Sequence, residues 1–247
     1  MCDRFATTKT APDLAKAFAA VDATGGEAKA DFNVAPTRKV PVVVVRKPVQ
    51  KEPTTADNEP VRSLRLMRWG LIPSWAKSAS IGAKMINARS ETLAEKPAYK
   101  RAFAARRCLV PADGYYEWVT LEDGTKQPYF HRPADGSELV MAGLYEIWKD
   151  PAEEDPDARV WSCTVITTTA ADDVGHIHDR SPMVLDPEHW EKWLDPDLQD
   201  LEQLATLLKP AVSGKLEIWP VSTDVNSVKN NRPDLLDRVE VDAHQLD

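Results

Sequence analysis

Five strand-like runs follow one another between residues 108 and 168, and they constrain the fold more than any other feature of the sequence. Asp-Gly pairs at 113–114, 123–124 and 135–136 supply turns between or beside them. Strands and helices do not alternate along the chain, which argues against parallel βαβ winding and favours an α+β fold. The runs are Cys108–Val110, Tyr115–Val119, Pro128–His131, Leu139–Trp148 and Val160–Thr168.

The rest of the chain adds further strands and several short helices. The polar stretch 47–60, which contains prolines, predicts an inserted hairpin loop, and the acidic stretch 150–158 predicts a surface loop. No repeat or linker divides the sequence, so residues 1–247 are expected to form one domain. Strands are predicted at Val40–Arg46, Leu64–Ile72 and Leu216–Val221, and helices at Ala11–Val21, Ser90–Glu95, Ala98–Ala105, Pro187–Leu194 and Leu201–Leu208.

Composition narrows the cellular context. The opening MCDRFATTKT has no apolar core of the kind that secretory signals carry, and the longest aliphatic run, Val42–Val45, is too short to cross a bilayer. The cysteines are Cys2, Cys108 and Cys163, an odd number at wide spacing. They fit neither a disulfide framework nor a metal site, so we expect a reducing, cytoplasmic compartment and neither metal nor cofactor.

Charge is distributed unevenly along the chain. The formal net charge is −8, yet the stretch 62–107 holds eleven basic residues and two acidic ones. Acidic residues gather at 150–157 and around 186–202. This asymmetry predicts a basic face on an otherwise acidic body, which suits a nucleic-acid partner. From charge alone, a solvated face without a ligand is an equal alternative.

Cys2 is the strongest pointer to chemistry. Its side chain is small enough to permit removal of Met1, and the chain would then begin with an α-amine and a thiol on adjacent carbons. Their reference pKa values, about 7.7–8.0 and about 8.5, leave both groups partly reactive near neutral pH. The amine can condense with an aldehyde to an imine, and the thiol can then close a thiazolidine. From its position alone, the ordinary interpretation of Cys2 as an incidental residue on a frayed terminus is favoured, and the remaining motifs decide between the two.

Four polar clusters lie in otherwise apolar or turn-like surroundings. Each has an ordinary alternative: a turn residue for Asn33, a surface charge for Arg89, the exposed side of an edge strand for Glu117, and a loop without function for the histidines. The clusters are FNVAPT with Asn33, MINARSET with Asn87 and Arg89, ADGYYEW with Glu117, and HIHDRSPM with His176 and His178.

Taken together, these motifs resemble the SOS-response-associated peptidase (SRAP) family, whose members crosslink to abasic sites in single-stranded DNA. The motifs that carry the resemblance are, in order, MCDRFA, FNVAPT, RWGLIPSW, INARSET, ADGYYEW and HDRSPM, and it continues to VKNNRPDLL at 228–236. One departure is Asp3, where the family usually has glycine. The resemblance implies a mixed, mainly antiparallel β-sheet or barrel-like core with flanking helices.

The resemblance also implies a mechanism. The amine of Cys2 would attack C1′ of the ring-opened sugar, and the thiol would close a stable thiazolidine. Glu117, between Tyr116 and Trp118, would donate protons, because desolvation raises the pKa of a carboxyl group. His178 would be a second acid or base that promotes β-elimination at the 3′ phosphate. Asn33 would orient the N-terminus or the opened sugar.

The same resemblance places single-stranded DNA on a surface formed by Arg4, Trp69, Trp75, Asn87 and Arg89, since a basic groove with interleaved aromatic residues suits single strands. For Trp69, a place in the core or as a wedge against Pro73 is the alternative. The expected partner is DNA with abasic sites, including sites at single-strand to double-strand junctions. We expect a cytoplasmic monomer that joins the nucleoid on DNA damage.

Two other functions fit part of the sequence. A cysteine peptidase could use Cys2 with His178 and Glu117, even to remove Met1, but it needs an oxyanion hole that the sequence does not identify. It also leaves the basic stretch without a purpose. A non-enzymatic single-strand binding module explains the charge but gives Cys2, Glu117 and His178 no role. We therefore favour covalent capture of abasic DNA.

Overall fold

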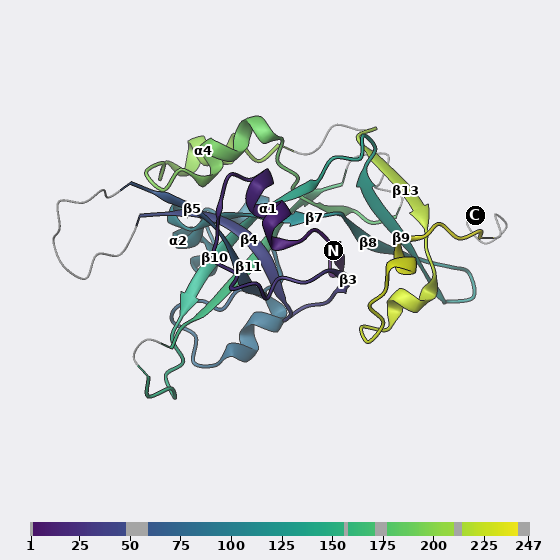
Figure 1. Cartoon of the computed structure of the whole chain (residues 1–247), viewed down its shortest axis with the longest axis horizontal. Helices are drawn as coiled ribbons and strands as arrows, with labels where there is room; N and C mark the ends of the chain where they lie inside the picture. The colour runs from purple at the N-terminus through teal and green to yellow at the C-terminus, as the bar shows by residue number, and fades with distance from the viewer. Residues whose placement is uncertain (1, 48–58, 156–157, 171–176, 210–213, 242–247) are drawn as a thin grey trace.

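The computed structural model describes residues 2–47, 59–155, 158–170, 177–209 and 214–241. Within these ranges, two β-sheets carry short helices on their outer surface (Figure 1). The strands are β1 (Phe5–Thr7), β2 (Val21–Asp22), β3 (Asp31–Val34), β4 (Lys39–Arg46), β5 (Val61–Trp69), β6 (Asn87–Arg89), β7 (Arg107–Ala112), β8 (Gly114–Thr120), β9 (Lys126–Pro133), β10 (Leu139–Trp148), β11 (Val160–Thr169), β12 (Arg180–Pro182) and β13 (Leu216–Pro220).

The larger sheet closes into a barrel. Its neighbours run β11-β10-β7-β4-β5, and β11 then pairs in parallel with β5 through Ser162 opposite Arg68 and Cys163 opposite Trp69. All other pairings along this run are antiparallel. Alternate residues of each strand point inward, and the interior is filled by buried side chains such as Val42, Trp69 and Cys163. The predicted α+β fold with a mainly antiparallel, barrel-like core is confirmed.

The smaller sheet brings the start of the chain beside the aromatic strand. Its order is β13-β9-β8-β1-β3, and β1 lies between β3 and β8 with antiparallel pairing on both sides. The backbone N–H of Tyr116 donates to the carbonyl oxygen of Arg4 at 2.9 Å, so the pairing extends beyond the assigned end of β1. This register places the segment around Cys2 next to the part of β8 that carries Glu117.

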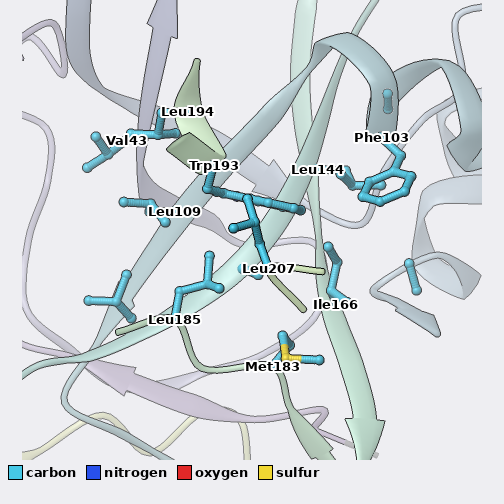
Figure 2. Packing of buried hydrophobic residues seen from close by; sticks show 14 of the residues in the cluster. Val43, Phe103, Leu109, Leu144, Ile166, Met183, Leu185, Trp193, Leu194 and Leu207 are labelled. Atoms are coloured by element: carbon cyan, nitrogen blue, oxygen red, sulfur yellow. The ribbon is translucent and has the colours of Figure 1, made fainter. Parts of the chain in front are cut away.

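Helices cover the outside of the barrel. Their apolar residues pack with outward-facing barrel residues such as Leu109, Leu144 and Ile166 around Trp193 (Figure 2). The buried guanidinium of Arg107 donates to carbonyl oxygens at the ends of α2 and α4, which lack partners within their own helices. The helices are α1 (Ala11–Ala17), α2 (Pro97–Ala105), α4 (Trp190–Leu194) and α5 (Leu201–Ala205), with 3₁₀ turns η1 (Ala79–Lys84), η2 (Ser90–Thr92), η3 (Pro187–His189), η4 (Thr223–Asn226) and η5 (Pro233–Leu236).

Several predicted boundaries differ from the structure for identifiable reasons. The strand expected to reach Ile72 ends at Trp69, because Gly70 adopts a φ of 123° and turns the chain against Gly82. The helix expected over 11–21 ends at Ala17, and Val21–Asp22 instead pairs in parallel with β5. Residues 48–58 of the predicted insertion, and 156–157 of the acidic loop, lie outside the described residues. Among the described helices, none is long and apolar enough to span a membrane.

Candidate functional site

Cys2 lies in the interior of the structure. Its side chain has no exposed surface, and its carbonyl oxygen accepts a hydrogen bond of 2.6 Å from Nδ2 of Asn87. Burial raises the pKa of the Cys2 thiol well above its ordinary value, and the nearby charges of Glu117 and Asp3 raise it further. The sequence predicted a thiol partly ionised near neutral pH, and that prediction is wrong for this conformation. A base must therefore remove the proton when the thiol reacts.

Asn87 ties the Cys2 segment to the barrel. It begins β6, which pairs in parallel with β11, and its carbonyl oxygen accepts a hydrogen bond of 3.2 Å from the Tyr99 hydroxyl. Its amide nitrogen is occupied by Cys2, while Oδ1 is buried and has no hydrogen-bond partner in the described chain. The Asn87 amide thus holds the backbone of Cys2, and contact between Asn87 and a DNA phosphate stays a prediction.

Glu117 lies on β8 opposite Tyr129, and its side chain is almost fully buried. This burial rules out the alternative of an exposed residue on an edge strand. Desolvation raises the pKa of Glu117 to about 7, with further upward contributions from Asp3 and Asp179. A carboxyl group with that pKa holds and releases a proton near neutral pH, as a general acid must. The negative charge of Glu117 also raises the pKa of the Cys2 thiol, so the carboxyl group and the thiol lie close enough to interact electrostatically.

His178 lies just before β12 and is half-buried. Its Nδ1 accepts a hydrogen bond of 2.9 Å from the backbone N–H of Arg180, which places the proton of the neutral ring on Nε2. Burial lowers the pKa of His178, although Asp179, with Oδ1 3.0 Å from the same Nδ1, opposes this. Since Nδ1 accepts the backbone hydrogen bond, we assign the neutral ring, and the Asp179 contact is then not an ion pair. His176 lies outside the described residues.

A bidentate ion pair holds the His178 loop against the strand that carries Asn87 and Arg89. The guanidinium of Arg180 donates to both carboxylate oxygens of Glu91, at 2.7 and 3.0 Å, and to the carbonyl oxygen of Thr167 at 2.7 Å. Paired, parallel hydrogen bonds of this kind fix direction as well as distance. The HDRSPM and INARSET motifs therefore meet at one end of β11.

Asn33 and Arg4 contact each other and a loop near the C-terminus. Nη1 of Arg4 donates to Oδ1 of Asn33 at 2.8 Å and to the carbonyl oxygen of Val225 at 2.9 Å. Asn33 is buried, and its Nδ2 lies within 3.2 Å of the carbonyl oxygens of Val225, Ser227 and Asn230. The hydrogen-bonding groups of the Asn33 amide are thus all used inside the protein. Asn33 positions Arg4, and a direct contact with the sugar stays a prediction.

The two tryptophans predicted to bind DNA differ sharply in exposure. Trp69 has no exposed surface, packs edge-on against Phe5 with ring centres 4.8 Å apart, and donates from Nε1 to the carbonyl oxygen of Ile86. It cannot stack on a base in this structure, so its assignment to the DNA surface is wrong and the core alternative holds. Trp75 is 62% exposed, and the side chain of Arg89 is exposed. These two residues are open to a ligand.

The basic stretch 62–107 forms only part of the predicted basic face. Arg107 is buried and burial lowers its pKa to about 10. Arg62 contacts Glu191 and the carbonyl oxygen of Phe18, and Arg106 pairs with Glu146 at 2.8 Å. These arginines serve the fold because their charge is already neutralised or hydrogen-bonded. The basic residues that remain exposed are Lys77, Lys84, Arg89, Lys96, Lys100 and Arg101.

Several residues that hold the site in place were not predicted from the sequence. Tyr99 donates a hydrogen bond to Asn87, while Glu91 and Asn226 accept hydrogen bonds from Arg180 and Trp118, which are near neighbours of His178 and Glu117 in the chain. The available signals were INARSET, which contains Glu91, and VKNNRPDLL, which begins two residues after Asn226. Among the described residues, no group of three or more His, Cys, Asp or Glu side chains could hold a metal ion.

Comparisons with known proteins agree with this geometry. The family model for SRAP, "SOS response associated peptidase", matches residues 1–228. The abasic site processing protein YoqW of Bacillus subtilis is 37% identical over 239 residues, which is 96% of this chain and 99% of that protein. The abasic site processing protein HMCES of Gallus gallus is 35% identical over 274 residues, 98% of this chain and 79% of that protein. A crystal structure from Bacteroides thetaiotaomicron superposes with a TM-score of 0.80 at 26% identity, over 97% of this chain and 100% of that one. This chain therefore belongs to the SOS response associated peptidase family.

Proposed function

We propose that this protein recognises abasic sites in single-stranded DNA and captures them covalently through Cys2 once Met1 has been removed. The observation that carries the proposal is the buried carboxyl group of Glu117, with a pKa of about 7, beside the Cys2 segment. Imine formation needs a proton donor near neutral pH, and this site provides one. The names of the relatives, abasic site processing proteins, point to the same substrate.

The first step joins the amine of Cys2 to the ring-opened sugar. The amine adds to the C1′ aldehyde and forms a carbinolamine. Protonated Glu117 then donates its proton to the carbinolamine hydroxyl, which leaves as water, and an iminium ion remains. Asn87 holds the carbonyl of Cys2 during this step, so that the amine stays in place and the condensation becomes an intramolecular reaction.

The second step closes the ring. Glu117 is a carboxylate after the first step, and it can take the proton from the Cys2 thiol, whose raised pKa keeps it protonated until then. The resulting thiolate adds to the iminium carbon and forms the carbon–sulfur bond of the thiazolidine. Glu117 ends the reaction protonated, as it began, and one water has been released overall. The order of steps follows from the two pKa directions.

His178 belongs to a side reaction in this proposal. Its Nδ1 accepts the hydrogen bond from the backbone N–H of Arg180, so the proton of the neutral ring is on Nε2. In β-elimination from the iminium ion, water takes a proton from C2′, the bond between C3′ and the phosphate oxygen breaks, and Nε2 of His178 donates its proton to the departing phosphate. Exposed Trp75 and Arg89 would hold the DNA strand by stacking and by charge. We expect the protein to act as a monomer on single strands, including those at junctions.

The pKa directions of Cys2 and His178 argue against the alternative function of a cysteine peptidase. A cysteine peptidase lowers the pKa of its thiol with an adjacent imidazolium or helix N-terminus. Here burial raises the pKa of the Cys2 thiol and lowers the pKa of His178, so the pair favours the two neutral forms.

Incubation with an abasic single-stranded oligonucleotide tests the proposal. The wild type should give a band that survives denaturation, while Cys2→Ala should give none. Cys2→Ser and Cys2→Ala both keep the α-amine and lack the thiol, so each should give an adduct only after borohydride reduction of the imine. Cys108→Ala is the matched control, since Cys108 is also fully buried, and it should crosslink like the wild type. A stable adduct with Cys2→Ala in the absence of borohydride would overturn the proposal.

A further inference from the structure

A loop near the C-terminus reaches back to the first residues of the chain. The loop runs from Asp224 to Asn231, and we refer to it as the C-terminal clamp. Its start is anchored by Val225, which is fully buried with Tyr116 and Trp219 in a small core behind the β8 sheet. This loop overlaps the VKNNRPDLL motif, to which the chemistry described above gives no role.

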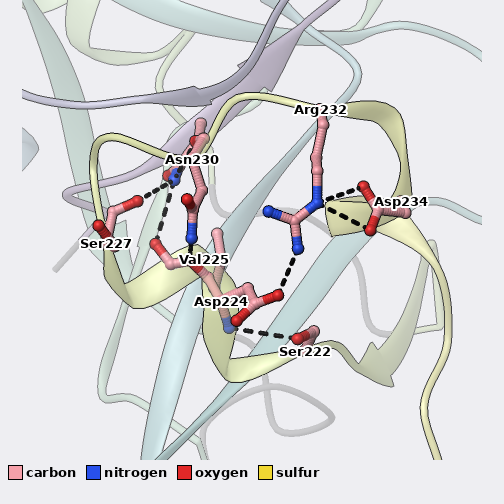
Figure 3. A network of polar contacts seen from close by, with 8 residues as sticks. Ser222, Asp224, Val225, Ser227, Asn230, Arg232 and Asp234 are labelled. Atoms are coloured by element: carbon pink, nitrogen blue, oxygen red, sulfur yellow. Dashed lines mark hydrogen bonds and ion pairs between the residues drawn. The ribbon is translucent and has the colours of Figure 1, made fainter.

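Contacts within the clamp and with the residues that directly follow it hold the loop in place. Arg232 pairs with both Asp224 and Asp234, and Nδ2 of Asn230 donates to the carbonyl oxygen of Asp224 at 2.8 Å (Figure 3). Its carbonyl oxygens turn toward the Asn33 amide, which bonds to the clamp at Val225, Ser227 and Asn230. A loop held by so many hydrogen bonds can fix the position of whatever it contacts.

The clamp contacts one residue close to Cys2 in the chain and the residue directly after Glu117. The carbonyl oxygen of Val225 accepts from Arg4, two residues from Cys2. Oδ1 of Asn226 accepts from Nε1 of Trp118, the residue after Glu117, at 2.7 Å. The guanidinium of Arg4 lies 5.7 Å from the centre of the Trp118 ring, so the two held side chains also contact each other. The clamp thus contacts the segment that follows Cys2 through Arg4, and it contacts β8 through Trp118, whose side chain lies on the opposite face of the strand from Glu117.

We propose that the C-terminal clamp positions the capture reaction, and that Asn226 is a positioning residue which acts through Trp118 and Arg4 to keep the Cys2 segment seated against β8. This inference rests on the proposed function for its consequence in catalysis, but the seating itself is a property of the free protein. Asn226 is exposed, so its replacement removes one hydrogen bond without opening the core.

Alkylation of the three cysteines tests the seating without DNA. All three are fully buried, so iodoacetamide should modify the folded wild type slowly at each position. Asn226→Leu removes the acceptor for Trp118 and should speed alkylation of Cys2 several-fold, while Cys108 and Cys163 stay protected. Asn226→Asp keeps an acceptor oxygen and should restore the wild-type pattern. Val228→Ala, an exposed change in the same loop, is the matched control and should also behave like the wild type.

The rate at which each variant captures abasic DNA is the second measurement. With saturating abasic oligonucleotide, Asn226→Leu should capture about tenfold more slowly, because misplacement of reacting groups is costly in rate, and Asn226→Asp should recover the rate. Unchanged Cys2 alkylation in Asn226→Leu would overturn the inference, and so would equal acceleration at all three cysteines, which would indicate general loosening. If the wild type captures no DNA, the proposed function fails, and the alkylation pattern still decides the inference.

Discussion

Replacing Glu117 with glutamine tests two consequences of its burial: the proton that the carboxyl group donates during capture, and the stability that the protein loses when this group is ionised. The pKa of Glu117 is raised from 4.5 to about 7 by burial. At pH 7, about half of the molecules then carry the proton, compared with about 1 in 300 for an unperturbed carboxyl group. Burial therefore increases the population of the proton donor more than a hundredfold. Glutamine occupies a similar volume but cannot donate a proton, so Glu117→Gln should slow capture about a hundredfold or more at neutral pH.

The same pKa predicts an effect on stability with a definite sign. A carboxyl group with a raised pKa binds more protons in the folded state than in the unfolded state, so the free energy of unfolding falls as pH rises between 4.5 and about 7. The loss is on the order of 3 kcal/mol at the top of that window, at about 1.4 kcal/mol for each unit of pKa. Glu117→Gln has no such penalty and should become the more stable protein above neutral pH.

Urea denaturation and single-turnover capture measure the two effects together. The free energy of unfolding of Glu117→Gln minus that of the wild type should rise by on the order of 3 kcal/mol between about pH 5 and about pH 8. The wild-type capture rate should fall above about pH 7, while the slow rate of the variant should lack that fall. The reasoning is refuted if the stability difference is the same at both pH values, or if Glu117→Gln captures DNA at the wild-type rate.

Three further predictions concern other residues of the site. Trp69→Ala should lower the free energy of unfolding by about 3–5 kcal/mol, because it leaves a cavity in the barrel interior. Trp75→Ala should leave thermal stability unchanged and weaken DNA binding. Arg89→Glu should reduce the affinity for lesion-containing and lesion-free strands alike, and binding by the wild type should weaken as salt rises, as fluorescence anisotropy can measure. His178→Ala should mainly change strand cleavage or reversal of the adduct, with a smaller effect on the initial rate of capture, in time courses that quantify adduct and cleaved strand separately.

The sequence predicted the long strands well because their signal is local. Leu139–Trp148 has the same bounds in the structure as in the prediction, since a continuous run of apolar and aromatic residues is typical of a buried strand. The short strands β1 and β3 carry no comparable pattern, because three or four residues cannot show a period. They form because neighbouring strands supply their hydrogen bonds, which is information from the tertiary structure.

The candidate site could be predicted in its residue types but not in its contacts. The aromatic surroundings of Glu117 indicated burial, and the structure shows it. The burial of Trp69 could not be read from RWGLIPSW, because a tryptophan beside arginine suits a DNA surface and a barrel interior equally. The sequence also overestimated the basic face that residues 62–107 form. Arg107 donates hydrogen bonds to carbonyl oxygens at helix ends, and this role depends on how distant segments pack.

Covalent capture through Cys2 can be tested by tandem mass spectrometry of the adduct between wild-type protein and an abasic single-stranded oligonucleotide. We expect the DNA to be attached to the peptide that begins with Cys2 and lacks Met1. The adduct mass should equal that of the processed protein plus the oligonucleotide, less one water. An adduct on a lysine, on Cys108 or Cys163, or on a chain that still carries Met1 would show that Cys2 is not the capturing residue.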